Sequence, residues 1–118
     1  VDDSRTIRDM LAMALSEAGF EPSLAEDGVH GLEVLEGMAP DAIITDINMP
    51  RLDGFGFIEA VRAQEQHRTT PIVVVTTESA AELKNRARAA GATGWIVKPF
   101  DPDKLVRALH TVAGPGGA

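Results

Sequence analysis

Residues 71–77 read PIVVVTT, in which four apolar residues follow a proline and precede two threonines. Ile and Val are β-branched, and a continuous apolar run of this kind is typical of a strand buried on both faces of a parallel sheet. Apolar residues recur at helical spacing on either side of it, over residues 55–61 and again over residues 83–90. A strand placed between two helices predicts βαβ units.

The rest of the chain continues this alternation. Short apolar runs predict further strands at residues 41–45 (DAIIT) and 95–97 (WIV), and a weaker one at residues 21–26 (EPSLAE). Apolar stripes predict three further helices: one over residues 4–19 that Gly19 ends, one over residues 27–38 that Asp27 caps and that turns Val29, Leu32 and Leu35 inward, and one through Leu105, Val106, Leu109 and Val112.

This order of elements predicts one α/β domain with a doubly wound parallel sheet and helices on both faces. Right-handed crossovers place ligand chemistry at the carboxyl ends of the strands. Such a sheet needs a strand before its first helix, but a helix begins almost directly after Val1 and Asp2. We therefore expect residues upstream of Val1 in the native protein. Residues 1–113 are expected to form the domain, and GPGGA at 114–118 a flexible tail.

The composition limits the classes of protein. The chain has 118 residues, of which 44% are hydrophobic and 25% charged, as in one soluble globular domain. Its net charge of −7 argues against a nucleic-acid partner, which needs a basic surface. It contains no cysteine, so disulfides and thiolate metal sites are excluded. No apolar stretch approaches the roughly 20 residues that span a bilayer, and no signal peptide is visible, so we expect a cytoplasmic protein without membrane partners.

Polar side chains stand at the carboxyl ends of the predicted strands. Asp2 and Asp3 follow the expected first strand, Asp46 follows AIIT, Thr76 closes IVVV, and Lys98 follows WIV. In a parallel sheet these side chains converge on one crevice. Crowded carboxylates favour a bound cation, and hard oxygen ligands suit Mg²⁺. A carboxylate there can act as a nucleophile that forms an acyl phosphate, which the lysine and the hydroxyl would complement.

Four motifs carry a family resemblance. DDS at 2–4, DINMPRLDG at 46–54, TT at 76–77 and KPF at 98–100 resemble the receiver domain of two-component response regulators. The match covers nearly the whole chain, and AGATGWIVKPF at 90–100 is most similar to stand-alone chemotaxis receivers. The resemblance implies a flavodoxin-like, five-stranded parallel sheet of order 2-1-3-4-5, with the first strand largely missing from this chain.

The resemblance also implies the central chemistry. Asp46 would accept a phosphoryl group from a phosphohistidine of a sensor kinase. Asp2 and Asp3 would hold Mg²⁺ together with Asp46 and the backbone carbonyl of Asn48. The chain would thus be a signalling switch that catalyses only its own phosphorylation and dephosphorylation, rather than an enzyme.

Further roles follow from the same resemblance. Thr76 would bond a phosphoryl oxygen after transfer, and Lys98 would neutralise its charge. Trp95 stands where the family keeps a switch aromatic, and Asn48 and Glu78 stand where it tunes self-dephosphorylation. The implied partners are a chemotaxis-type sensor histidine kinase, a downstream protein such as a flagellar motor switch, and a phosphatase.

Other interpretations remain open. Asp46 taken alone could be a turn residue, and Asp3 a helix cap. Within the receiver class, the chain could be a phosphorelay or cell-cycle receiver, or a module of a larger regulator. A Mg²⁺-dependent phosphohydrolase with an aspartyl-phosphate is more remote, because Asn48 stands where such an enzyme needs a second acid. A nucleotide-binding module is disfavoured because DDS replaces a glycine-rich first turn.

Overall fold

Helices and strands alternate as predicted from residue 43 onward, whereas the first two helices follow each other without a strand between them at residues 18–27. The computed structural model describes residues 1–113, so the tail predicted at 114–118 lies outside the described residues. The elements are, in chain order, α1 (Arg5–Glu17), α2 (Gly28–Leu35), β1 (Ile43–Thr45), α3 (Gly54–Ala63), a short 3-10 helix (Glu65–His67), β2 (Ile72–Thr76), α4 (Ala81–Ala90), β3 (Gly94–Val97) and α5 (Pro102–Ala113).

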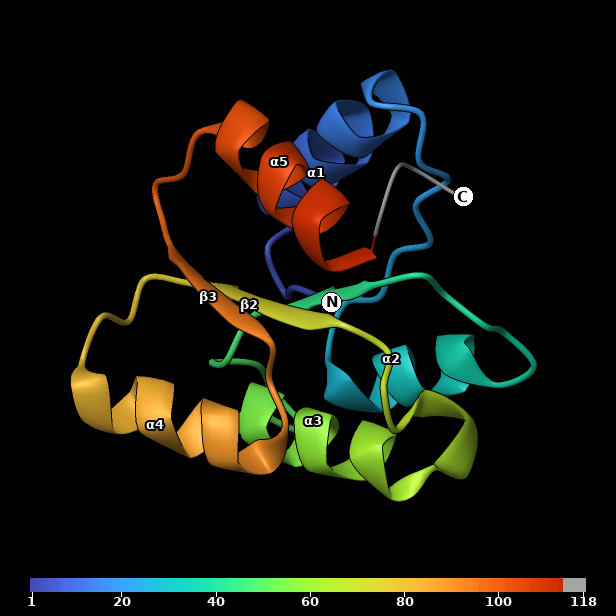
Figure 1. Ribbon diagram of the computed structural model, residues 1–118, viewed down its shortest axis with the longest axis vertical. Helices are drawn as coiled ribbons and strands as arrows, with labels where there is room; N and C mark the ends of the chain where they lie inside the picture. The colour runs from blue at the N-terminus through green and yellow to red at the C-terminus, as the bar shows by residue number, and fades with distance from the viewer. Residues whose placement is uncertain (114–118) are drawn as a thin grey trace.

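The three strands found within residues 1–113 form one parallel sheet in the order β1-β2-β3. In this register Thr45 lies beside Val74, and Val75 lies beside Ile96. Figure 1 shows α1 and α5 on one face of the sheet and α2, α3 and α4 on the other. The predicted α/β fold, with a parallel sheet between two layers of helices, is therefore confirmed.

Strand β2 supplies the core on both faces, because every one of its residues is buried. Val74 belongs to a cluster with Phe57 of α3 on the face that α2, α3 and α4 cover. Val75 points the other way, into a cluster with Leu105 of α5. Successive side chains of a strand alternate between its two faces, so a fully apolar strand needs helices on both.

Beside β1, where the prediction has two further strands, the structure has only isolated backbone hydrogen bonds of Val1 and Asp2. The Val1 nitrogen donates to the Ile44 carbonyl at 2.6 Å, and the Asp46 N–H donates to the Val1 carbonyl at 2.9 Å. On the other side, the Asp2 N–H donates to the Ala25 carbonyl at 3.1 Å. No strand is assigned at residues 21–26, so the strand predicted there is wrong, because only Val1 and Asp2 lie beside it.

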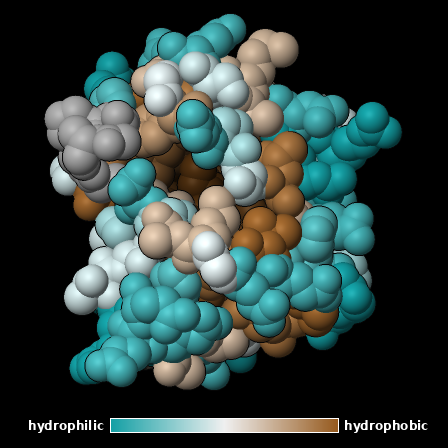
Figure 2. All heavy atoms as spheres, turned by 90° about the vertical axis from the view of Figure 1, so that its right-hand side faces the viewer, coloured by the Kyte–Doolittle hydropathy of each residue, from teal (hydrophilic) through white to brown (hydrophobic). Residues whose placement is uncertain are grey.

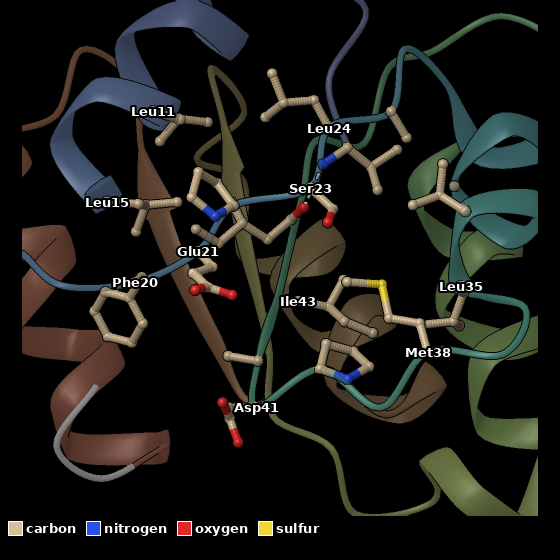
Figure 3. A pocket seen from close by; sticks show the side chains of 18 of the residues that line it. Leu11, Leu15, Phe20, Glu21, Ser23, Leu24, Leu35, Met38, Asp41 and Ile43 are labelled. Carbon is tan, nitrogen blue, oxygen red and sulfur yellow. Dashed lines mark hydrogen bonds between the residues drawn. The ribbon is translucent and has the colours of Figure 1, made fainter. Parts of the chain in front are cut away.

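A cleft of about 540 Å³ lies next to Val1, which is one of its lining residues. It lies between the segment that leads from Phe20 to Ala25 and strand β1, and aliphatic side chains such as Leu15 and Ile43 line it (Figure 3). Figure 2 shows apolar side chains within a hollow on this face of the molecule. Within residues 1–113 the sheet therefore has three strands, where five were predicted.

The inward face of α2 agrees with the prediction at Leu35, which is buried, and at Leu32, which is half-buried and packs against the same core cluster. Val29 is half-buried and does not belong to that cluster. Gly31 approaches α3 closely, since a Cβ there would lie 2.8 Å from the ring of Phe57. Close packing on α3 therefore depends on a small residue as well as on the apolar stripe. Within residues 1–113, no helix combines the length and apolar content that crossing a bilayer requires.

We expect Gly54→Ala to destabilise the fold. A Cβ on Gly54 would collide with the Asp46 carbonyl oxygen and lie 2.7 Å from Ile47 Cα, and both of these are backbone atoms that cannot turn away. Such overpacking costs on the order of 1–3 kcal/mol, more than the gain in helix propensity of roughly 0.5–1 kcal/mol. Urea unfolding measures the loss. Gly94→Ala is the control, because its Cβ would meet only Val73 methyl groups at 3.8 and 3.9 Å. Equal losses in both variants would contradict this account.

Candidate functional site

Three carboxylates meet at the carboxyl end of β1. Asp46 directly follows the strand, and Asp2 and Asp3 follow the short backbone ladder beside it. One carboxylate oxygen of each lies within 4.8 Å of the others. Asp2 is 2% exposed and Asp46 8%, whereas Asp3 is open to solvent. We call these three residues the acidic cluster, and its place is the edge of the sheet that the sequence predicted.

Backbone groups orient the two buried acids. The Ile47 N–H donates to Asp46 Oδ1 at 2.6 Å, and the Ser4 N–H donates to Asp2 Oδ1 at 2.9 Å. The guanidinium of Arg8 donates to the Asp2 carbonyl at 2.7 Å, which ties the start of α1 to this edge. Each buried carboxylate therefore has one oxygen held by the main chain and one that faces Lys98.

Lys98 joins the buried acids. Its Nζ lies 2.8 Å from Asp2 Oδ2 and 2.8 Å from Asp46 Oδ2, and its side chain is only 12% exposed. Burial alone lowers the pKa of Lys98, but the hydrogen bonds that its ammonium donates to Asp2 and Asp46, together with the charges of these carboxylates, outweigh burial and raise that pKa. The lysine therefore stays charged and compensates the repulsion between the two carboxylates.

The other predicted residues lie at the ends of β2 and β3. Thr76 is fully buried, and its carbonyl accepts a 2.7 Å hydrogen bond from the Lys98 N–H. Its hydroxyl accepts a long contact, 3.4 Å, from the Glu78 N–H. The Asn48 side-chain amide donates to Glu78 Oε1 at 3.2 Å, and the Trp95 indole N–H donates to the Glu78 carbonyl at 3.0 Å. Glu78 thus connects the Asn48 and Trp95 side chains.

One ion pair near this edge was not predicted from the sequence. Arg51 binds Asp27 with two hydrogen bonds, from Nε to Oδ2 at 2.8 Å and from Nη2 to Oδ1 at 3.0 Å. Asp27 was predicted only as a helix cap, which it also is, because it accepts from the His30 N–H at 2.9 Å. Nothing in the motif NMPRLDG itself points to the partner of Arg51, since the two residues are far apart in the sequence.

Comparison with known proteins assigns the chain to a family. A family model described as "Response regulator receiver domain" matches residues 1–110, so the chain belongs to the receiver domains of two-component systems. It is 40% identical to chemotaxis protein CheY1 of Helicobacter pylori over 116 residues, which are 97% of this chain and 94% of the relative. The solved structure of CheY4 from Vibrio cholerae is 46% identical with a TM-score of 0.90, covering 94% of this chain and 92% of that one.

A third relative bears on the metal. The receiver domain of a Pseudomonas aeruginosa sensor histidine kinase is 29% identical with a TM-score of 0.89, over 97% of this chain and 93% of that one. It was solved with a magnesium ion coordinated in its active-site cleft. The acidic cluster fits such an ion, because its three carboxylates converge within 4.8 Å and offer the hard oxygen ligands that Mg²⁺ takes.

We expect Lys98→Met to destabilise the metal-free protein, because it leaves two neighbouring buried carboxylates without a counter-charge. The loss at pH 7 should reach about 3 kcal/mol, the lower end of the range for breaking a buried pair, since Asp3 leaves the site open to water on one side. Urea unfolding in EDTA measures the loss. Lys104→Met, at an exposed position of α5, is the control and should change stability little.

The same pair of variants gives a pH dependence. The folded-state pKa of Lys98 lies above its ordinary value of 10.5, so its stabilisation is complete below 10.5. It is lost as the pH rises through the raised value. The difference in unfolding free energy between the native protein and Lys98→Met should therefore be constant from pH 7 to 10 and shrink above 10.5. A difference that persists at strongly alkaline pH would show that lost packing, not lost charge, is responsible.

Proposed function

We propose that this chain is a phosphorylation-activated signalling switch, with residues 1–113 as its receiver domain and Asp46 as the phosphoryl acceptor. The observation that carries the proposal is the Asp46 carboxylate at the end of β1, buried yet 2.8 Å from the Lys98 ammonium and adjacent to two further acids. Family membership and the similarity to chemotaxis proteins support it.

The transfer is a displacement at phosphorus. An Asp46 carboxylate oxygen forms the new P–O bond as the P–N bond of the kinase phosphohistidine breaks, and the electron pair returns to the imidazole nitrogen. The Ile47 N–H fixes the rotation of the carboxylate. The Lys98 ammonium already lies where phosphoryl charge would accumulate, so it stabilises that charge without reorganisation.

Mg²⁺ belongs to this proposal as the resident cation. Asp2, Asp3 and Asp46 would hold it through carboxylate oxygens, and Asn48 through its backbone carbonyl. When bound, the ion supplies positive charge that offsets the charge of the phosphoryl oxygens. Asp2 and Asp3 differ in exposure, so the buried acid fixes the inner side of the site and the exposed one faces incoming ions.

Incubation with acetyl phosphate and Mg²⁺ should add one phosphoryl group, which intact-mass spectrometry detects and mild base removes. Asp46→Asn should abolish the addition, because an amide is not a nucleophile of this kind. Asp41→Asn is the matched control, since Asp41 is an exposed acid just before the amino end of the same strand, and should be labelled like the native protein. Undiminished labelling of Asp46→Asn would refute the assignment.

The lifetime of the phosphorylated state would depend on Asn48 and Glu78. Their side chains are joined by a 3.2 Å hydrogen bond, and they follow Asp46 and Thr76 by two positions each. A bridge between the loops after β1 and β2 can screen the acyl phosphate from water, and larger or smaller side chains there would change how easily water reaches it.

Phosphorylation would be read out through Thr76 and Trp95. The new phosphoryl group carries about −1.5 to −2 charge and strong acceptor oxygens, so it draws the Thr76 hydroxyl away from its weak contact with the Glu78 N–H. Glu78 also accepts from the Trp95 indole through its carbonyl. A shift of this loop therefore changes the surroundings of Trp95, as a population shift between two packings.

We expect phosphorylation to change the emission and acrylamide quenching of Trp95, the single tryptophan, beyond the effect of Mg²⁺ alone. Thr76→Ala should remove this change while Asp46 is still phosphorylated, because the hydroxyl that couples them is gone. Thr77→Ala, the exposed neighbour, is the control and should respond like the native protein. A full fluorescence response in Thr76→Ala would show that the signal reaches Trp95 by another route.

The proposed partners are a chemotaxis-type sensor histidine kinase, a phosphatase and a target such as a flagellar motor switch, in the cytoplasm. A shallow hollow of about 70 Å³ beside Trp95, with Lys84 and Arg88 at its border, offers a basic and aromatic surface for an acidic target. The similarity to a receiver domain from a sensor kinase supports the alternatives of a phosphorelay receiver or a module of a larger regulator. Phosphotransfer from purified kinases of each class would separate these alternatives.

A further inference from the structure

Arg51 has an unusual backbone conformation. Among the described residues 1–113, it is the one residue other than glycine with a positive φ, at 67°. The Leu52 N–H donates to the Pro50 carbonyl at 2.8 Å, so Arg51 is the central residue of a three-residue turn. Residues with a side chain adopt this region at an energetic cost, and they persist there only when the surrounding structure holds them.

Contacts with the start of α2 hold this turn. The guanidinium of Arg51 donates hydrogen bonds to both carboxylate oxygens of Asp27. The Asp27 side chain is 5% exposed, whereas the Arg51 side chain is 52% exposed. The side-chain hydrogen bond from Arg51 holds the pKa of Asp27 below its ordinary value, so the carboxylate stays charged. Close by, a Cβ on Gly28 would lie 2.5 Å from the Leu52 carbonyl oxygen. The turn therefore contacts the start of α2 at two places, through Arg51 on Asp27 and through Leu52 on Gly28.

The same loop carries the site at its other end. It begins directly after Asp46, whose Oδ1 accepts from the Ile47 N–H, and it closes with the Gly54 N–H donating to the Ile47 carbonyl at 2.8 Å. Asn48 lies between these bonds and the Arg51 turn. Rotation of the chain at Arg51 would therefore change the direction in which the backbone leaves the acidic cluster.

We propose that Arg51 is a positioning residue for the phosphorylation site, whose ion pair with Asp27 holds the strained turn and thereby sets the backbone of Ile47 and Asn48. This rests on the proposed function, in which the Asn48 carbonyl and Asp46 hold Mg²⁺. The pair lies outside the acidic cluster, and Arg51 makes no contact with Asp2, Asp46 or Lys98 in the described hydrogen bonds and ion pairs. Its effect is exerted through the loop.

The first test is amide hydrogen exchange without Mg²⁺. Arg51→Ala keeps a side chain at a positive φ but loses the ion pair, so the amides of Ile47 and Gly54 should exchange faster. Asp27→Asn keeps a capping oxygen but loses the charge, and should have the same effect. Arg51→Gly needs no ion pair, because glycine adopts a positive φ freely, so its exchange should lie closer to the native protein. The amides of α4 serve as the internal control.

The second test is Mg²⁺ binding to the same variants by calorimetry. Arg51→Ala and Asp27→Asn should bind Mg²⁺ about tenfold more weakly, as when an outer-shell partner of a metal ligand is removed, and Arg51→Gly should recover most of the affinity. Asp3→Ala is the positive control for loss of the metal. Arg107→Ala, at an exposed position of α5, is the matched control and should bind like the native protein.

The exchange and Mg²⁺-binding results together test the positioning role of Arg51. Unchanged exchange at Ile47 and Gly54 in both pair-breaking variants would show that the ion pair does not hold the loop. Faster exchange with unchanged Mg²⁺ affinity would restrict Arg51 to a structural role and overturn the positioning role. An Arg51→Gly variant as impaired as Arg51→Ala would overturn the strain argument. A native protein that binds no Mg²⁺ would refute the metal site of the proposed function, while the exchange data would still judge the loop.

Discussion

The Lys98 ammonium between two buried carboxylates is the interaction on which the rest of this edge depends. Asp46 follows β1 and Lys98 follows β3, so the lysine side chain reaches across the end of β2, which lies between them. Strand β2 closes there with Thr76, whose carbonyl also anchors the Lys98 backbone. The Lys98 ammonium lies 2.8 Å from an oxygen of each carboxylate and offsets the repulsion between their charges. The ion pair between Lys98 and Asp46 can therefore form only if β1, β2 and β3 end side by side at the same edge of the sheet.

That requirement explains why the alternation of elements in the sequence could reveal the site. PIVVVTT indicated a strand buried on both faces, and such a strand fixes helices above and below and a parallel sheet. The carboxyl ends of the strands then meet at one edge, so the sequence alone could place Asp2, Asp3, Asp46 and Lys98 together. The hydrogen bonds from Lys98 to Asp2 and Asp46 are seen only in the structure.

The remaining features depend on contacts that no local pattern encodes. EPSLAE was expected to form a strand, but backbone pairing requires a neighbour, and only the Asp2 N–H meets this segment, at Ala25. The ion pair between Arg51 and Asp27 links two loops whose spacing in the sequence carries no periodic signal. The hydrogen bond from the Trp95 indole to the Glu78 carbonyl depends on a side-chain rotation that is set by packing. Propensity and periodicity determine elements, whereas these contacts are decided by the tertiary fold.

The single tryptophan packs on only one of the two core clusters that lie on opposite faces of the sheet. Trp95 packs against the cluster shared by α2, α3 and α4, and the chain has one tryptophan and no tyrosine. The opposite layer, with α1 and α5, holds only phenylalanine among its aromatic packing residues, Phe20 and Phe100. Tryptophan emission therefore reports the side of the sheet that α2, α3 and α4 cover. Loosening confined to the α1–α5 layer would leave that emission almost unaltered.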